Sequence, residues 1–326
     1  MIDDGDYIEL SDVRRSGREI PWKQRKRDSI KISDSLARLG DIDHAKRMKY
    51  CAVALNYDKD LETLGMKLTK RDLRFCKHFL CPICQGRKSI SNFYRLQRII
   101  KRIEEEDGKS PALILITLTV KNVSAEAFPE AIKKILSGWK KIERKAKMGQ
   151  IKGYYRSLEV TVPNSNEYHP HLHVLCMVDE DYFKKKNNDY IKIEELVQFW
   201  KQSISAEYTP VCYIQRVKGE KGILEVCKYM VKSSDITQNH TSEEIDQIII
   251  TLITGLTRRR LISYGGRFKE VNKMIKEEDA NKRKNGNGEE ELLNLTGRSG
   301  ECGEYVAEEI YHWDWYRMDY ARIEPE

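Results

Sequence analysis

Three of the seven histidines of this 326-residue chain lie within five residues, in the segment His169-Pro170-His171-Leu172-His173. Residues i and i+2 of a β-strand point to the same face of a sheet, so His171 and His173 would present two imidazoles side by side. Imidazole nitrogens are common ligands of divalent metal ions. The spacing therefore predicts a metal-binding pair on a strand, and Pro170 is expected to break that strand before His169.

A metal site of this kind needs a third ligand, and the strand expected before the histidines offers Glu159. A carboxylate suits Mg²⁺ or Mn²⁺, which prefer oxygen ligands. Glu167 is a competitor, but it lies in the turn between the two strands, so Glu159 is the expected ligand. The alternative is that Glu159 is an ordinary glutamate at a strand edge that faces water.

A second group of reactive side chains lies in residues 222–233, where the sequence predicts a short helix. Glu225 and Tyr229 are four residues apart and would share one face of that helix, with Lys232 three residues further along. A tyrosine nucleophile, a lysine that stabilises charge on a phosphate (Lys228 or Lys232) and a glutamate base could together carry out phosphoryl transfer. The same residues are also typical of an exposed helix with a half-buried tyrosine.

The eight cysteines include three that are close together, in the pattern Cys76-x4-Cys81-x2-Cys84. Disulfide frameworks are typical of short secreted chains, and a chain of this length with an acidic N-terminus is not expected to be one. With Cys51 the three would complete a four-coordinate structural Zn²⁺ site, and His78 is an alternative to Cys51 as the fourth ligand. A redox pair of Cys81 and Cys84 would leave Cys76 unexplained.

Strand and helix patterns alternate from residue 112 onward, with a hairpin in the middle. This order favours the α+β class, with an antiparallel central sheet and flanking helices, over a doubly wound parallel sheet. The expected strands are 112–121, 154–162, 171–178 and 211–217. The expected helices are 89–106, 124–149, 193–204, 222–233 and 242–256.

The net charge of +7 is unevenly distributed, because residues 301–326 hold eight acidic and two basic residues, a net −6, which leaves +13 for the rest. A basic body suggests a polyanionic partner such as nucleic acid. The acidic N-terminus does not resemble a signal peptide and the longest apolar run is about half a membrane span, so a cytoplasmic protein without membrane contact is expected. The expected divisions are a basic polar arm (1–40), a Cys-rich zinc-binding module (41–105), a main domain (106–276), a linker (277–300) and an acidic tail (301–326).

Three motifs occur in an order that resembles the rolling-circle plasmid replication initiators. They are Thr117-Leu-Thr119 on a strand, then His-Pro-His-Leu-His, then Glu-x-x-x-Tyr-x-x-Lys. These belong to the histidine–hydrophobic–histidine (HUH) endonuclease superfamily. The chain is most similar to the branch with a single tyrosine and a glutamate four residues before it, which also carries an N-terminal cysteine block. The segment 256–268 is also similar to that branch, and the resemblance covers roughly residues 45–270.

The resemblance implies that residues 106–276 form an HUH nicking domain in which His171, His173 and Glu159 hold Mg²⁺ or Mn²⁺. Tyr229 would attack the scissile phosphate, leaving a 5′-phosphotyrosyl link and a 3′-OH that primes DNA synthesis. Glu225 would then activate water to end the reaction. The implied partners are plasmid origin DNA, a host helicase and polymerase, and a second copy of the chain in a homodimer.

Several alternatives remain open on the sequence. A relaxase or transposase of the same superfamily would use the same chemistry on other DNA, and a zinc-dependent DNA-binding regulator would use none of it. A zinc hydrolase lacks its usual His-Glu-x-x-His pattern here. Tyr264 is a less suitable nucleophile because it is far from the motif. Gly108-Lys109-Ser110 lacks the earlier glycine of a phosphate-binding loop, so an ATPase is not expected. Candidate phosphate contacts, chosen on charge, lie within 14–27 and 258–260.

Overall fold

The computed structural model describes residues 7–13, 19–60, 66–69, 73–164, 166–183, 190–284 and 305–323. The chain divides into two compact units. Unit 1 combines residues 1–91 with residues 281–326, and unit 2 comprises residues 92–280. Each unit contains one five-stranded antiparallel sheet with helices, which confirms the expected α+β class.

The sheet of unit 2 has the strand order β7-β4-β6-β5-β8. β5 and β6 form the expected hairpin, and β6 is the central strand between β5 and β4. The apolar run of β4 is buried along most of its length, because helices cover both faces of the sheet. The strands are β4 (Ala112–Thr119), β5 (Gly153–Asn164), β6 (Glu167–Val178), β7 (Cys212–Val217) and β8 (Ile262–Gly265). The first four lie close to the predicted ranges, although β6 begins four residues earlier than expected, and β8 was not predicted.

Pro170 does not interrupt β6, contrary to expectation, and it pairs with Val160 of β5. β4 ends at Thr119, opposite His171, so no strand residue of β4 lies opposite Pro170. Proline has no backbone N–H to donate, and at this position β6 no longer pairs with β4, so no hydrogen bond between these two strands is lost.

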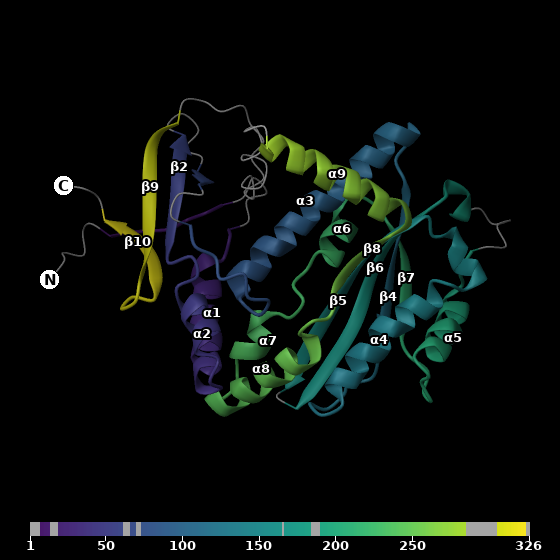
Figure 1. Cartoon of the computed structure of the whole chain (residues 1–326), viewed down its shortest axis with the longest axis horizontal. Helices are drawn as coiled ribbons and strands as arrows, with labels where there is room; N and C mark the ends of the chain where they lie inside the picture. Colours follow the sequence, from purple (N-terminus) through teal and green to yellow (C-terminus); the bar gives the residue numbers. More distant parts are fainter. Residues whose placement is uncertain are drawn as a thin grey trace. The chain divides into compact units, whose positions relative to one another are not determined.

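Helices α3, α6 and α9 cover one face of this sheet, and α4 and α5 cover the other (Figure 1). Apolar side chains at helical spacing on α3 and α9 pack with Leu113, Leu115, Tyr155 and Leu175 of the sheet. The helices are α3 (Pro82–Asp107), α4 (Phe128–Ile142), α5 (Ile193–Ser203), α6 (Glu220–Val226), α7 (Ser233–Thr237), α8 (Ser242–Leu256) and α9 (Gly266–Lys284), with 3₁₀ turns at Ala146–Gln150 and Glu180–Phe183.

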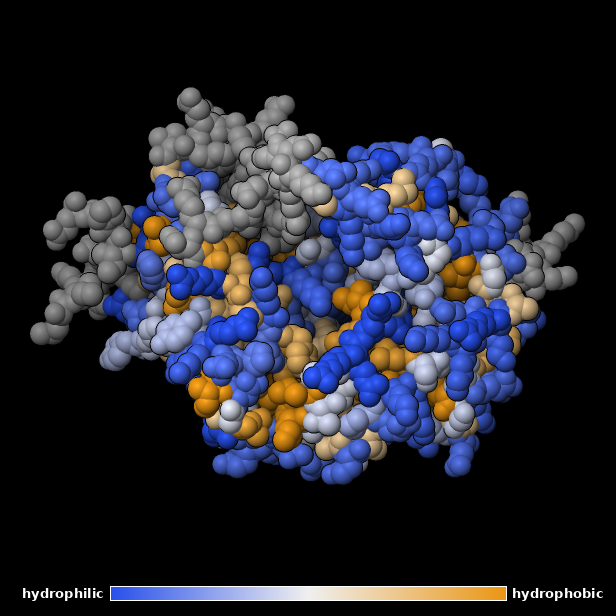
Figure 2. Space-filling model, in the orientation of Figure 1, coloured by the Kyte–Doolittle hydropathy of each residue, from blue (hydrophilic) through white to orange (hydrophobic). Residues whose placement is uncertain are grey.

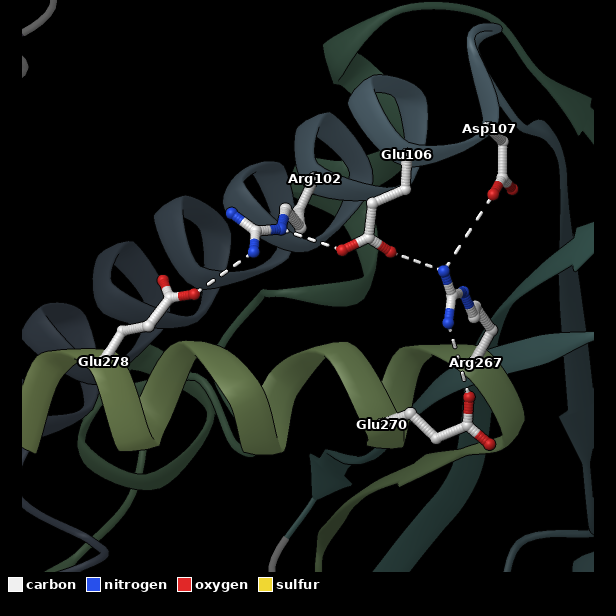
Figure 3. A network of polar contacts seen from close by, with 6 residues as sticks. All are labelled: Arg102, Glu106, Asp107, Arg267, Glu270 and Glu278. Carbon is white, nitrogen blue, oxygen red and sulfur yellow. Dashed lines mark hydrogen bonds and ion pairs between the residues drawn. The ribbon is translucent and has the colours of Figure 1, made fainter.

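Ion pairs join α3 to α9 along their exposed sides (Figure 3). Arg102 contacts Glu106 at 2.9 Å on its own helix and Glu278 at 3.3 Å on α9. Arg267 at the start of α9 binds Glu106 in turn, and its other nitrogen lies 3.7 Å from Glu270. These contacts link charges that would otherwise be solvated separately, and they surround the apolar contact between the two helices.

The sheet of unit 1 has the order β1-β10-β9-β2-β3 and is also antiparallel. Its longest pairing joins β2 to β9, with Ala54 opposite His312 and Lys59 opposite Ala307. The helices α1 and α2 pack against each other beside it. The elements are β1 (Tyr7–Glu9), α1 (Trp22–Arg38), α2 (Ile42–Lys49), β2 (Ala54–Asp60), β3 (Met66–Leu68), β9 (Tyr305–Asp314) and β10 (Asp319–Ile323).

Unit 1 differs from the polar arm and the acidic tail expected at the two ends of the sequence. Residues 22–38 form a helix whose Trp22, Ile32 and Leu36 are buried. Part of the expected acidic tail forms β9 and β10, because Glu309 is neutralised by Lys59 at 2.9 Å and Arg322 at 3.3 Å. Two segments lie outside the described residues. They are residues 14–18 of the expected arm and residues 285–304, which include most of the expected linker.

The face of the molecule drawn in Figure 2 is mostly hydrophilic, with apolar residues in separate groups. Among the described residues, the helices are all too short or too polar to cross a membrane.

Candidate functional site

Glu159, His171 and His173 lie together on the face of the unit 2 sheet that α3, α6 and α9 cover. Glu159 of β5 is directly opposite His171 of β6, and His173 is two residues further along the same face. The Glu159 carboxylate oxygen lies 3.5 Å from His171 Nε2 and 3.1 Å from His173 Nε2. The three side chains are 10–12% exposed, so the group is largely buried. Their ligand atoms can hold one metal ion.

The two imidazole rings are oriented by hydrogen bonds at their other nitrogens. His171 Nδ1 lies 3.2 Å from the carbonyl oxygen of His169, and a carbonyl can only accept, so this nitrogen carries the proton. His173 Nδ1 lies 3.2 Å from Thr117 Oγ1 on β4. Both Nε2 atoms therefore face Glu159, as ligands of a metal ion require.

The electrostatics of the group favour an ionised Glu159. Burial alone would raise the pKa of this carboxyl group, but hydrogen bonds and charge from His171 and His173 outweigh burial and hold the pKa well below its usual range. His169 is also on β6, and burial and the neighbouring His171 lower its pKa. A carboxylate that stays charged between two imidazoles is a suitable partner for a divalent cation.

Glu167, the competing ligand, has different partners. Its carboxylate accepts hydrogen bonds from Asn164 at 3.2 Å and Asn122 at 3.4 Å. These contacts hold it at the hairpin end of β6, and it is not among the residues that cluster with His171 and His173.

The segment that carries Tyr229 is not the helix that the sequence predicts. α6 ends at Val226, and Glu225 and Tyr229 do not share a helical face. The helix stops because the chain turns to follow β5. Ser157 Oγ donates to the Val226 carbonyl at 2.7 Å, and the Val160 N–H donates to the carbonyl of Met230 at 2.7 Å.

These bonds hold the backbone on both sides of the half-buried Tyr229 against β5, the strand that carries Glu159. Tyr229 directly precedes Met230, which binds Val160, and Val160 directly follows Glu159. The sequence predicted a helix here, and it did not show that non-helical backbone around Tyr229 would be hydrogen-bonded to β5.

Of the charged residues near Tyr229 in sequence, two form an ion pair and one is exposed to solvent. Lys228 Nζ lies 2.5 Å from Glu225 Oε1, so these two expected site residues form an ion pair. Lys232 is exposed immediately before α7. Tyr264, in contrast, packs edge-on against Tyr155 with ring centres 5.1 Å apart, and burial raises its pKa to about 12. Its hydroxyl is therefore poorly suited to act as a nucleophile.

A second candidate metal group in unit 1 comprises Cys51, Cys76, Cys81 and Cys84. The sulfur atoms lie 3.6 Å apart for Cys51–Cys84 and Cys76–Cys84, and 3.7 Å apart for Cys51–Cys81. A tetrahedral ion with bonds of about 2.3 Å to sulfur needs separations of roughly 3.8 Å. The four thiols therefore fit a tetrathiolate site for one metal ion.

Backbone N–H groups and a lysine support the sulfur atoms. The N–H of Cys76 donates to Cys51 Sγ at 3.4 Å, and that of Lys77 donates to Cys84 Sγ at 3.3 Å. Lys26 is fully buried, and its Nζ donates to the carbonyls of Lys49 at 2.6 Å and Cys51 at 2.7 Å. Burial lowers the pKa of Lys26 to about 8, although the nearby thiols oppose this.

His78, the alternative fourth ligand, is outside the cysteine group. Its Nδ1 accepts from the Leu80 N–H at 3.2 Å, and its ring stacks on Phe79. Burial lowers the pKa of His78 to about 4. The structure thus groups Cys51, and not His78, with the other three cysteines. The sequence did not predict that Lys26 would be buried beside the cysteine group, because Lys26 lies among several basic residues and no pattern distinguishes it.

Comparisons with known proteins give one consistent result. A family model described as "Replication protein" matches residues 67–321. A relative named "Protein rep" from Lentilactobacillus hilgardii is 30% identical over 321 residues, which covers 95% of this chain and 98% of that protein. Another "Protein rep", from Streptococcus pneumoniae, is 34% identical over 274 residues, covering 82% of this chain and 83% of that protein. No solved structure matches the chain.

Proposed function

Because the chain belongs to the replication protein family, we propose that it initiates rolling-circle plasmid replication by nicking one strand of the origin DNA. The observation that carries this proposal is the group of Glu159, His171 and His173 beside the backbone segment that holds Tyr229. The superfamily assignment to the HUH endonucleases, and to the branch with one tyrosine, belongs to this proposal.

Glu159, His171 and His173 would hold Mn²⁺ or Mg²⁺, which would supply a Lewis acid for the scissile phosphate. The donor set fits such an ion, because both Nε2 atoms face an ionised carboxylate. Thr117 and the His169 carbonyl keep the two rings in that orientation.

The Tyr229 hydroxyl would attack the phosphorus atom of the scissile phosphodiester. The bond between phosphorus and the 3′ oxygen breaks as the tyrosyl bond forms, which leaves a 5′-phosphotyrosyl link and a free 3′-OH. The exposed Lys232 would stabilise negative charge on the phosphate. Lys228, held by Glu225, would add positive charge near the tyrosine and favour loss of its proton.

Glu225 would act at termination, when the covalent link is resolved by hydrolysis or strand transfer. Glu225 is half-buried and lies four residues before Tyr229 in the sequence. It would take a proton from a water molecule as that water attacks the phosphotyrosyl phosphorus. That step requires Glu225 to exchange its ion pair with Lys228 for a water molecule.

In unit 1, Cys51, Cys76, Cys81 and Cys84 would hold Zn²⁺ as a structural ion. Origin DNA is the proposed substrate. A host helicase and polymerase are proposed partners, because nicking provides a 3′-OH primer but neither unwinds the duplex nor extends the primer. Association of two copies of the chain at the origin is part of the same proposal.

The test is a cleavage assay on labelled single-stranded origin DNA with Mn²⁺, resolved on a denaturing protein gel. The wild-type chain should form a protein–DNA adduct, and Tyr229→Phe should form none. Tyr264→Phe is the matched control, because it removes a different tyrosine hydroxyl from the same unit, and it should keep the adduct. An adduct that survives Tyr229→Phe would refute the assigned nucleophile, and DNA binding without any nick would favour a non-catalytic regulator.

A further inference from the structure

The turn between β9 and β10 in unit 1 carries aromatic side chains in an unusually exposed position. Tyr316 is 96% exposed and Trp315 is 42% exposed, although large aromatic residues are normally well buried. Tyr50, at the end of α2, is 58% exposed and meets the Trp315 ring edge-on at 6.0 Å. We call Tyr50, Trp315 and Tyr316 the aromatic patch.

The turn that presents the aromatic patch is held in place by specific contacts. Asp314 Oδ1 accepts from the N–H groups of Tyr316 at 2.8 Å and Arg317 at 3.0 Å. Met318 has a left-handed backbone with φ of 54°, which is unfavourable for a residue with a side chain. Arg27 Nε of α1 donates to the Met318 carbonyl at 2.9 Å and fixes this conformation. The exposure of Tyr316 is therefore built into the fold and does not result from a loose loop.

Two lysines lie beside the aromatic patch. Lys49 Nζ lies 5.9 Å from the centre of the Trp315 ring. Lys46 is exposed and lies four residues before Tyr50, on the same side of α2. Of the nearby acids, Asp314 is occupied in the turn and Asp319 binds Lys23. Asp34 lies 3.8 Å from Lys49, but both side chains are about half exposed, so this ion pair is weak.

We propose that the aromatic patch is a second DNA contact, at which unpaired bases stack on Tyr316 and Trp315 while Lys46 and Lys49 bind neighbouring phosphates. Exposed rings with interspersed cations are the means by which proteins bind single strands without sequence preference. The lysines favour DNA over a protein partner, since lysine is depleted at protein interfaces. The inference rests on the proposed function only for the choice of DNA as the polyanion.

Stacking on an aromatic ring contributes about 1–3 kcal/mol per base, which corresponds to at least a fivefold change in affinity. Tyr316→Ala and Trp315→Ala should each weaken binding of a labelled single-stranded DNA of mixed sequence by fivefold or more. The measurement is fluorescence anisotropy on the full, Zn²⁺-loaded chain without added Mn²⁺ or Mg²⁺. Lys46→Ala combined with Lys49→Ala should reduce the slope of log affinity against log salt by about 1.4, at roughly 0.7 per phosphate contact.

Tyr190→Ala is the matched control, because Tyr190 is as exposed as Trp315 (42% each) but lies in unit 2, shortly before α5. It should bind DNA like the wild type, and all variants should melt at the wild-type temperature. Patch variants within twofold of wild type, or an equal loss in Tyr190→Ala, would overturn the inference. Adduct formation with Mn²⁺ and saturating DNA tests the proposed function separately, and Tyr316→Ala should retain it.

Discussion

The hydrogen bond between Thr117 and His173 offers a direct test of how the candidate metal group is held. Thr117→Val removes the hydroxyl that lies 3.2 Å from His173 Nδ1 and leaves a side chain of similar volume. The His173 ring would keep its place in the sheet, but nothing would fix the direction of its Nε2 atom. We therefore expect weaker metal binding without loss of the fold.

The magnitude follows from two independent estimates. Removing one partner of a buried hydrogen bond costs about 1–3 kcal/mol, and the His173 side chain is only 10% exposed. Loss of an outer hydrogen bond to a metal-ligating histidine lowers metal affinity about 10- to 100-fold. A tenfold change corresponds to about 1.4 kcal/mol, so both estimates agree on a tenfold loss or slightly more.

The assay is calorimetric titration of the Zn²⁺-loaded chain with Mn²⁺. Thr119→Val is the matched control, because Thr119 is on the same strand and its hydroxyl donates to the Val211 carbonyl at 2.9 Å instead of contacting a histidine. Thr119→Val should bind Mn²⁺ like the wild type. An affinity of Thr117→Val within twofold of wild type, or an equal loss in both variants, would refute the reasoning.

Three further predictions concern stability. Cys84→Ser should abolish bound Zn²⁺, measured by atomic absorption, and lower the melting temperature, because metal-binding energy contributes to folding. Asp279→Asn should cost about 1–3 kcal/mol at pH 7 in urea unfolding, because Asp279 lies 2.8 Å from both Arg95 and Arg98. Gly255→Ala should cost about 1–3 kcal/mol, because its Cβ would lie 2.4 Å from the Phe128 ring.

The effect of Asp279 should also depend on pH. Burial would raise its pKa, but Arg98 and Arg95 outweigh burial and lower the pKa below that of a free aspartate. The stabilisation is therefore complete above about pH 4, the usual range of an unfolded aspartate, and is lost as the pH falls through the lowered pKa. The difference between wild type and Asp279→Asn should shrink in acid, and a constant difference would contradict this cause.

Matched variants distinguish these effects from general damage. Glu278→Gln changes the adjacent residue, which is 45% exposed and contacts Arg102 at 3.3 Å, and should cost less than about 1 kcal/mol. Gly149→Ala adds a methyl group where no heavy atom lies within 4 Å and should leave the packing intact. Unchanged Zn²⁺ content in Cys84→Ser would refute the tetrathiolate site.

The sequence predicted the candidate metal groups well where local periodicity decided the outcome. The i and i+2 spacing of His171 and His173 required only that residues 171–173 form a strand, and the hairpin then placed Glu159 opposite them. The cysteine spacing likewise predicted a group in unit 1 but left Cys51 and His78 open as its fourth member, and the structure groups Cys51 with the other three cysteines. These features depend on residues close in sequence or on one short connection.

The prediction was wrong where distant parts of the chain compete with local propensity. The pattern of residues 222–233 is helical, but backbone bonding to β5 ends the helix at Val226. The acidic residues 305–323 form strands because β2, some 250 residues earlier, supplies both backbone partners and the neutralising Lys59. Neither effect can be read from a sequence window, because the deciding partner lies outside it.

Unit 1 is formed by both ends of the sequence, and this has a consequence for its folding during synthesis. About 210 residues separate residue 91 from β9, so at roughly 5–20 residues per second the ribosome needs about 10–40 s to add them. During that interval Cys51 is already outside the ribosome, but Trp313, whose N–H donates to the Val53 carbonyl, and Tyr320, which donates to Ala52, have not been made. Until β9 and β10 are made, the segment next to Cys51 lacks these contacts, and translation that stops before β9 leaves the sheet of unit 1 without its central strand.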